Sequence, residues 1–118
     1  MFRRLRRWFQ DNRAWRTAHL AAWRGVAEPG PDGLSPFQHK CSAALRAEIR
    51  GLELRRDGQK EVFLTAAIPN TDVKVYVYVD GGGLQGSQLD FRAEEWDYKT
   101  PEELIAELVN EVKARVAI

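Results

Sequence analysis

One pattern in the sequence has the residue types for metal-dependent catalysis. Asp57, Asp72 and Lys74 follow the order in which nucleases place two carboxylates to hold Mg²⁺ and a lysine to orient the attacking water. The short half of this pattern recurs as Glu111-Val112-Lys113 within an expected helix, so the chain produces it by chance. The ordinary interpretation is a solvated acidic residue near a strand lysine. A nuclease is therefore the last of three functional hypotheses.

A glycine-rich segment from Gly81 to Gly86 spells the G-x-G-x-x-G pattern after an expected strand. A dinucleotide site needs these glycines to open directly into a helix whose N-terminus holds the pyrophosphate. The residues that follow, 87–92, are typical of a strand instead. We therefore expect a flexible hairpin loop at 81–86 and predict no cofactor.

Histidine and cysteine are too few to suggest a metal centre, since the chain has two histidines and one cysteine. His39 and Cys41 lie two apart on an expected helix, and at that spacing side chains point about 200° apart. Cys41 belongs to an apolar stripe, so we expect it to be buried. His19 falls on the apolar face of the first expected helix, which favours packing or an interface. No catalytic residue or metal ligand is predicted, and an enzyme is the less favoured class.

Charge is divided unevenly along the chain, although the net charge of the 118 residues is only +1. Residues 1–60 hold 13 Lys/Arg and 6 Asp/Glu, a net charge of +7. Residues 61–118 hold 5 Lys/Arg and 11 Asp/Glu, a net charge of −6. Opposed halves of this kind either neutralise each other within one fold or face different partners.

Residues 1–24 predict a basic, Trp-rich amphipathic helix, followed by a Gly/Pro linker at 25–35. The candidate contact residues of this helix are Phe2, Leu5, Trp8, Phe9, Trp15, Leu20, Trp23, Arg3, Arg4, Arg6 and Arg7. Indoles beside arginines suit a boundary between apolar and anionic material. The second hypothesis is therefore a peripheral membrane or assembly protein, anchored by this helix to an anionic membrane surface. Packing of the same face on the protein's own sheet or on another protein fits equally, and nucleic acid is a less favoured partner.

An acidic, aromatic cluster in the C-terminal half carries the leading hypothesis. Its candidate partner-binding residues are Trp96, Tyr98, Asp90, Glu94, Glu95, Asp97, Tyr76 and Tyr78. Aromatic anchors surrounded by carboxylates are typical of a face that binds a basic protein, although many acidic runs are only solvated surface. We expect a non-enzymatic protein-binding module. Inhibitors and immunity proteins that neutralise nucleic-acid-directed toxins are one type that fits its size and charge.

The elements expected to position these residues form an α+β domain over residues 36–118. Ser35 is expected to begin one helix and Thr100-Pro101-Glu102-Glu103 another, each with a capping box and a proline at the first helical position. Between these helices, strict alternation at 73–79 predicts a strand. The expected fold is a three- or four-stranded antiparallel meander flanked by helices, in the order α-α-β-β-β-(β)-α.

No apolar stretch of the sequence approaches the roughly 18 residues that a membrane span requires. The single cysteine also rules out an internal disulfide framework. We therefore expect a cytoplasmic protein, which associates with a membrane if the N-terminal helix is an anchor.

Overall fold

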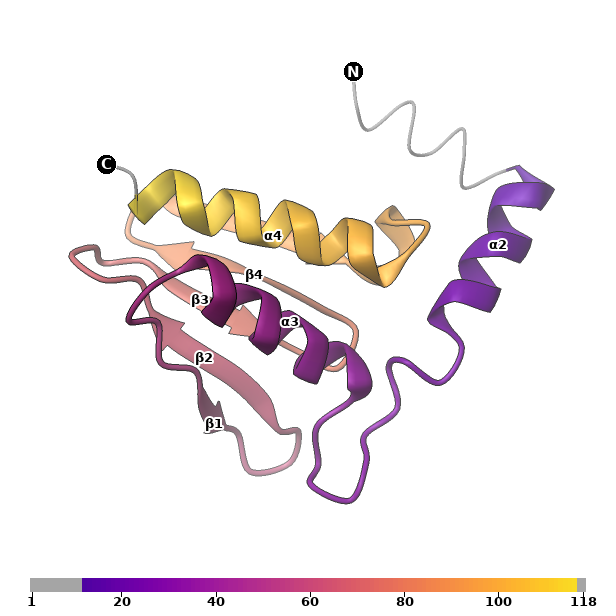
Figure 1. The fold of residues 1–118 in the computed structure, drawn as a ribbon, viewed down its shortest axis with the longest axis horizontal. Coiled ribbons are helices and arrows are strands. Elements are labelled where there is room, and N and C mark those ends of the chain that lie inside the picture. The colour runs from indigo at the N-terminus through magenta and orange to yellow at the C-terminus, as the bar shows by residue number, and fades with distance from the viewer. Residues whose placement is uncertain (1–11, 117–118) are drawn as a thin grey trace.

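The structure is a computed structural model that describes residues 12–116 (Figure 1). Its elements, in chain order, are α2 (Arg13–Trp23), α3 (Pro36–Glu48), β1 (Arg55–Asp57), β2 (Phe63–Ala67), β3 (Lys74–Val77), β4 (Gly81–Gly86), β5 (Leu89–Glu94), the 3-10 helix η1 (Glu95–Asp97) and α4 (Pro101–Val116). The five strands form one antiparallel sheet in the order β1-β2-β3-β4-β5. The predicted α+β class and antiparallel meander are confirmed, but the sheet has five strands and not three or four.

The sheet differs from the prediction at its glycine-rich strand. Residues 81–86 form β4, paired on both sides, and are not the expected hairpin loop. Glycine is depleted in strands because it has no side chain to pack. In β4, the close approach of neighbouring groups explains the glycine at position 83. A Cβ there would overlap the carbonyl oxygen of Phe91 and lie 2.5 Å from the Tyr76 hydroxyl. β4 leads into β5 rather than into a helix, so the geometry of a dinucleotide fingerprint is not present there.

The two predicted helix starts are confirmed. Ser35 caps α3 with the full capping box, in which its hydroxyl accepts from the Gln38 N–H and the Gln38 side chain accepts from the Ser35 N–H. Thr100 Oγ1 accepts from the Glu103 N–H at 3.2 Å at the start of α4. Local sequence signals therefore set both helices that flank the sheet.

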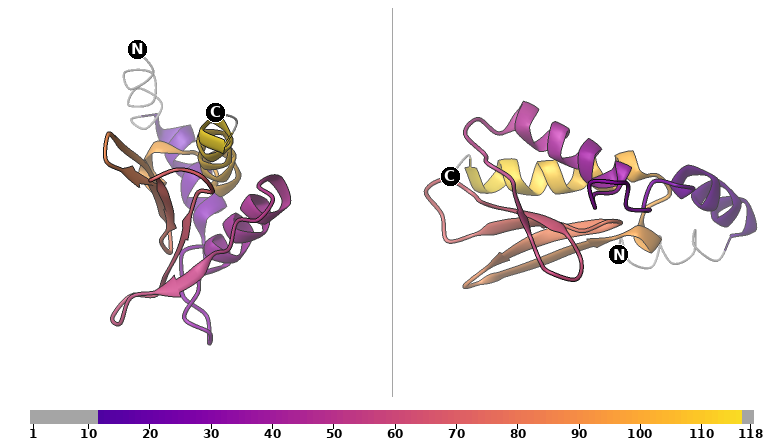
Figure 2. Two further views of the ribbon diagram at one scale, coloured as in Figure 1. Left: turned by 90° about the vertical axis from the view of Figure 1, so that its left-hand side faces the viewer. Right: turned by 90° about the horizontal axis from the view of Figure 1, so that it is seen from below.

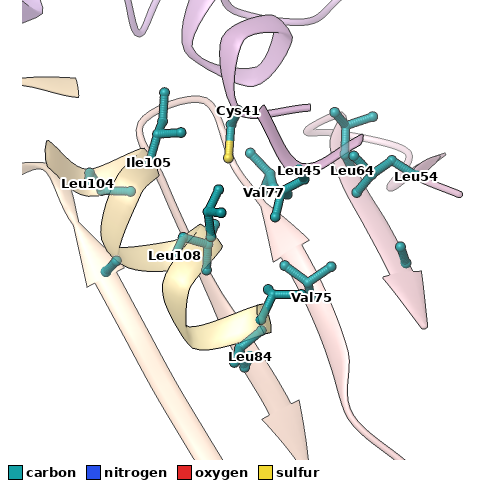
Figure 3. Close-up of a cluster of buried hydrophobic side chains, with 14 of the residues drawn as sticks. Cys41, Leu45, Leu54, Leu64, Val75, Val77, Leu84, Leu104, Ile105 and Leu108 are labelled. Carbon is teal, nitrogen blue, oxygen red and sulfur yellow. The ribbon is translucent and has the colours of Figure 1, made fainter. Parts of the chain in front are cut away.

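Helices α3 and α4 lie side by side on one face of the sheet (Figure 2). The core lies between them and the sheet, where Cys41 and Leu45 of α3 and Leu104 and Leu108 of α4 meet the inward side chains of the strands (Figure 3). No helix of the described chain covers the opposite face (Figure 2). An antiparallel sheet with one packed face and one open face is a stable arrangement.

A buried glutamine joins α3 to the sheet. Gln38 is fully buried, and its Nε2 donates to the carbonyl oxygens of Val62 at 2.9 Å and Val77 at 3.1 Å. Its Oε1 accepts from the Ser35 N–H at 2.8 Å. Every hydrogen-bonding atom of the side chain that faces the core therefore has a partner, which offsets the cost of burying it.

The N-terminal helix is shorter than predicted within the described residues. Asn12 has an extended backbone, and its side chain accepts hydrogen bonds from the Ala14 and Trp15 N–H groups, so α2 begins at Arg13. The helical periodicity over 1–24 therefore does not continue through Asn12, because asparagine favours the N-cap over the helix interior. No helix among residues 12–116 is long and apolar enough to cross a membrane.

The sequence left open whether this helix packs on the domain, and the structure shows that its C-terminal half does. Trp23 is 5% exposed, packs on Phe37 with ring centroids 5.6 Å apart, and belongs to the same core as Val75. Its indole N–H donates to the carbonyl oxygen of Tyr98 at 3.1 Å. The part of the helix that is described is thus anchored to the body of the protein rather than held away from it.

Candidate partner-binding face

The open face of the sheet follows from strand alternation and register. Residues paired across antiparallel strands point to the same side. Thr65, Tyr76, Gly83 and Arg92 form one such row across β2 to β5. Because Val75 and Val77 on either side of Tyr76 are core residues, this row lies on the opposite face, away from the helices. Their neighbours along each strand, such as Val75 and Val77, point into the core.

Three aromatic rings form a row on this open face. The ring centroids of Phe63 and Tyr78 are 5.3 Å apart, and those of Tyr78 and Tyr76 are 5.2 Å apart. Tyr76 reaches over Gly83, where the absent side chain leaves room for its ring. Tyr78 is 42% exposed. The row therefore offers solvent-exposed aromatic surface on a rigid sheet, which suits contact with a partner.

A hollow of about 290 Å³ lies at the end of this row. Gly81, Gly82 and Ala93 form part of its lining. The rest of the lining consists of three aromatic residues, Tyr76, Tyr78 and Trp96, and four charged residues, Asp80, Glu94, Glu95 and Arg92. The hollow thus combines aromatic side chains with an excess of negative charge.

The charges around the hollow are only partly compensated from within. Glu95 Oε1 lies 3.4 Å from His19 Nε2 of α2. Among the described residues, no cation lies within ion-pair distance of Asp80 or Glu94. Partial burial raises the pKa of Tyr76, while a hydrogen bond from Arg92 and the charge of Arg92 act in the opposite direction. Arg92 is therefore engaged with a tyrosine of the row.

Among the predicted partner-binding residues, Tyr76, Tyr78, Glu94, Glu95 and Trp96 line this hollow together. Trp96 is 58% exposed. Asp90 lies on the same face, two residues from Arg92 along β5, and outside the hollow. Asp97 is half-buried in η1.

Tyr98 has a different position from the one expected of an exposed anchor. Its side chain is 4% exposed and belongs to the core. Its carbonyl oxygen accepts a hydrogen bond from the Trp23 indole N–H and lies 2.7 Å from His19 Nδ1. Because a carbonyl oxygen can only accept, His19 Nδ1 is the protonated donor of this second hydrogen bond. Tyr98 joins α2 to the segment before α4, and the structure removes it from the exposed face.

Sequence reasoning missed three residues of this face: Phe63, Asp80 and Arg92. The alternation of half-buried and buried residues along Phe63–Ala67 places Phe63 on the side of Tyr76. That signal is present in the sequence, but pairing β2 with β3 in the correct register is needed to use it. Asp80 and Arg92 join the site only because β4 is a strand that brings β5 next to β3.

The residues of the N-terminal helix divide between packing and exposure. Trp23 is buried, while Trp15 is half-buried and stacks on His19 with ring centroids 5.0 Å apart. Leu20 is 67% exposed. The remaining predicted residues, Phe2, Arg3, Arg4, Leu5, Arg6, Arg7, Trp8 and Phe9, lie outside the described residues. The aromatic side of α2 is therefore largely used for contacts within the protein.

The structure separates the residues of the nuclease hypothesis. Asp57 pairs with Phe63 at the start of β2, whereas Lys74 pairs with Ala67 at its end, about 13 Å away at ~3.3 Å per residue. Asp72 accepts hydrogen bonds from the hydroxyl and the N–H of Ser87, which lower the pKa of this carboxyl. Asp72 therefore closes a turn. Within residues 12–116, no group of three or more His, Cys, Asp and Glu side chains is arranged to hold a metal ion.

His39 and Cys41 do not share a site. His39 is exposed, with its Nε2 2.8 Å from Asp32 Oδ2, while Cys41 is fully buried. Burial raises the pKa of the Cys41 thiol to about 12. This cysteine is a packed apolar residue, as its place on the apolar stripe of α3 predicts.

Comparison with known proteins identifies no relative: no family model, no curated protein and no solved structure matches this chain.

Proposed function

We propose that this chain is a non-enzymatic protein-binding module that holds a basic partner on the open face of its sheet. One observation carries the proposal: the aromatic row ends in a hollow whose carboxylates at Asp80 and Glu94 have no cationic partner among the described residues. Interfaces concentrate their binding energy in aromatic anchors, and complementary charge sets the choice of partner. The hollow has both aromatic anchors and uncompensated negative charge.

The charge of this face favours a protein over a nucleic acid. Around the hollow, the outward charges are Asp80, Glu94 and Glu95 against Arg92 alone. Arg55 and Lys74 lie on the same face by strand register, but outside the lining of the hollow. Nucleic-acid binding requires cations to contact phosphates. A basic protein, such as the target of an inhibitor or immunity-type protein, meets complementary charge instead.

Affinity capture with the full chain tests the proposal. A basic protein captured from the native host is purified, and its affinity is measured for the wild type, Glu94→Lys and Trp96→Ala. Both variants are expected to weaken binding at least tenfold, since one reverses a charge in the hollow and the other removes an aromatic side chain. Glu61→Lys makes the same charge change in the exposed loop before β2 and is expected to bind like the wild type.

Circular dichroism and thermal melting show whether each variant keeps its fold. Unchanged affinity in folded Glu94→Lys and Trp96→Ala would discard this face as the binding site. Equal weakening by Glu61→Lys would show a non-specific charge effect and would also contradict the proposal.

The alternative proposal is a membrane or assembly protein anchored through the N-terminal helix. It is supported by exposed Leu20 among the exposed arginines Arg13, Arg16 and Arg24 of α2 and its C-cap. Co-sedimentation with vesicles containing anionic lipid tests it. Binding that is lost when Leu20 and Arg16 are both replaced by serine supports an anchor, and absence of binding at low salt eliminates it.

A further inference from the structure

We infer that the hollow holds one arginine side chain of the basic partner and prefers it to lysine. This inference depends on the proposed function, because it names the group that the same face recognises. It follows from the size of the hollow, the flat aromatic surfaces beside it and the placement of its carboxylates.

The size of the hollow fits a single side chain. Pockets for drug-sized ligands span roughly 300–1,000 Å³, and the volume of about 290 Å³ lies at the lower limit of that range. Its lining residues Tyr78 and Trp96 are exposed, so a chain crossing the sheet face can insert a side chain without entering the core. A protruding residue of a partner is therefore the appropriate occupant.

The aromatic side chains favour a planar cation. A guanidinium stacks on the faces of tyrosine and tryptophan rings, and it is more weakly hydrated than an ammonium group. Tyr78 is 42% exposed and belongs to the hollow, so part of its ring is accessible to such a group. Lysine offers a compact, strongly hydrated charge and gains less from a flat surface.

The carboxylates supply the acceptors that a guanidinium needs. Asp80 precedes β4, and Glu94 lies opposite Gly81 at the end of β5, so the two acids approach the hollow from adjacent strands. Neither has an ion-pair partner among the described residues. Arginine presents five N–H donors in a planar fork, which can reach more than one acceptor at once.

The same face already contains one arginine–tyrosine contact. Arg92 and Tyr76 lie on the same side of the sheet, on either side of Gly83, and the nearby Arg92 guanidinium acts to lower the pKa of Tyr76. With Arg92 counted, the four charged side chains of the hollow still sum to −2. A second guanidinium is therefore electrostatically favourable and matches a contact that the sheet face itself makes.

A titration with three matched peptides tests the inference on the full chain. The peptides are acetyl-GSXGSXGS-amide, with X as arginine, lysine or citrulline, and binding is followed by NMR at low salt through the backbone signals of Tyr78, Asp80 and Glu94. We expect the arginine peptide to bind about two- to fivefold more tightly than the lysine peptide, from a cation–π gain at a partly exposed ring. The citrulline peptide has a similar shape without the charge and is expected to bind most weakly.

Variants separate the aromatic contribution from the charge. Tyr78→Leu is expected to remove the preference for arginine, and Tyr78→Phe is expected to keep it, because the ring remains. Glu94→Gln should weaken both cationic peptides about two- to fivefold, as expected for a partly exposed ion pair. Glu61→Gln, the matched control outside the hollow, should leave both affinities unchanged.

The outcomes distinguish the two proposals. If lysine and arginine peptides shift the same signals with equal affinity, and Glu94→Gln weakens both, the arginine inference is overturned while a basic partner remains supported. If neither cationic peptide shifts these signals, or Glu61→Gln weakens binding as much as Glu94→Gln does, the binding face itself is refuted.

Discussion

Replacing Trp23 with alanine tests whether α2 is an integral part of the folded body. The side chain is 5% exposed, packs on Phe37 and shares the core with the sheet. Truncating a buried tryptophan to alanine costs about 3–5 kcal/mol. We add no further cost for the lost indole hydrogen bond, because His19 Nδ1 still donates to the Tyr98 carbonyl oxygen. We expect a loss of about 4 kcal/mol.

Urea unfolding followed by circular dichroism measures this loss. At a slope of ~2 kcal/mol per molar urea, the midpoint should fall by about 2 M with little change in slope. Trp23→Phe keeps most of the packing, loses the N–H donor and is expected to cost about 1 kcal/mol. Leu20→Ala is the control on the same helix, and its 67% exposure predicts a change within about 0.5 kcal/mol.

The result that refutes this reasoning is specific. If Trp23→Ala changes the free energy of unfolding by less than about 1 kcal/mol, as Leu20→Ala should, α2 contributes little to the folded body. The packing of Trp23 on Phe37 would then not be a stabilising contact in solution.

Three further perturbations follow from other parts of the structure. Gln38→Leu removes the partner of the Ser35 N–H and of the Val62 and Val77 carbonyl oxygens. Chemical denaturation should show that the free energy of unfolding falls by about 3 kcal/mol or more. The control Gln85→Leu, on the exposed face, should change it little. Gly83→Ala places a Cβ against Phe91 and Tyr76, so it should lower the melting temperature and shift the NMR signals of the Tyr76 ring. The control is Gly30→Ala, whose Cβ would make only ordinary van der Waals contacts, and it should do neither. For Cys41, burial raises the folded thiol pKa from its ordinary value of 9.0 to about 12, so this group stabilises the fold fully below pH 9. Its contribution should be lost at about 1.4 kcal/mol per pH unit above pH 9, a slope absent from Cys41→Ala; an equal slope in both proteins would contradict the assignment.

The elements that the sequence predicts well are those with short-range causes. The capping box at Ser35 and the Thr100 side-chain cap set the starts of α3 and α4, since a cap depends on residues three positions apart. The alternation of Val75 and Val77 with Tyr76 likewise needs only neighbouring residues. These features predicted the α+β class without knowledge of how strands pair.

The features that the sequence did not predict depend on contacts between distant residues. β4 is a strand because Gly83 lies beneath Tyr76 and beside Phe91, which propensity alone does not show. Tyr98 packs in the core, and its carbonyl oxygen contacts His19 and Trp23, 79 and 75 positions earlier in the chain. The signal at Asn12 was local and available, but helical periodicity across it concealed the N-cap.

The candidate site was predicted in composition but not in arrangement. The cluster of Glu94, Glu95 and Trp96 is visible as a run in the sequence, and β5 with η1 carries it to one end of the open face. Tyr76 and Tyr78 join it through strand pairing, since the glycines of β4 bring β3 and β5 to either side of the hollow. The sequence therefore identifies the acidic and aromatic residues of the site, but not the hollow that strand pairing forms between them.

The lining contributed by Gly81 and Gly82 has a consequence for how this family of surfaces can diverge. Because that part of the hollow is main chain, its shape is fixed by strand pairing and not by any side chain. The rim residues Asp80, Glu94 and Trp96 lie outside the core, and surface substitutions of this kind usually change stability by within ~0.5 kcal/mol. Side chains at the rim can thus change while the strand pairing beneath them stays intact.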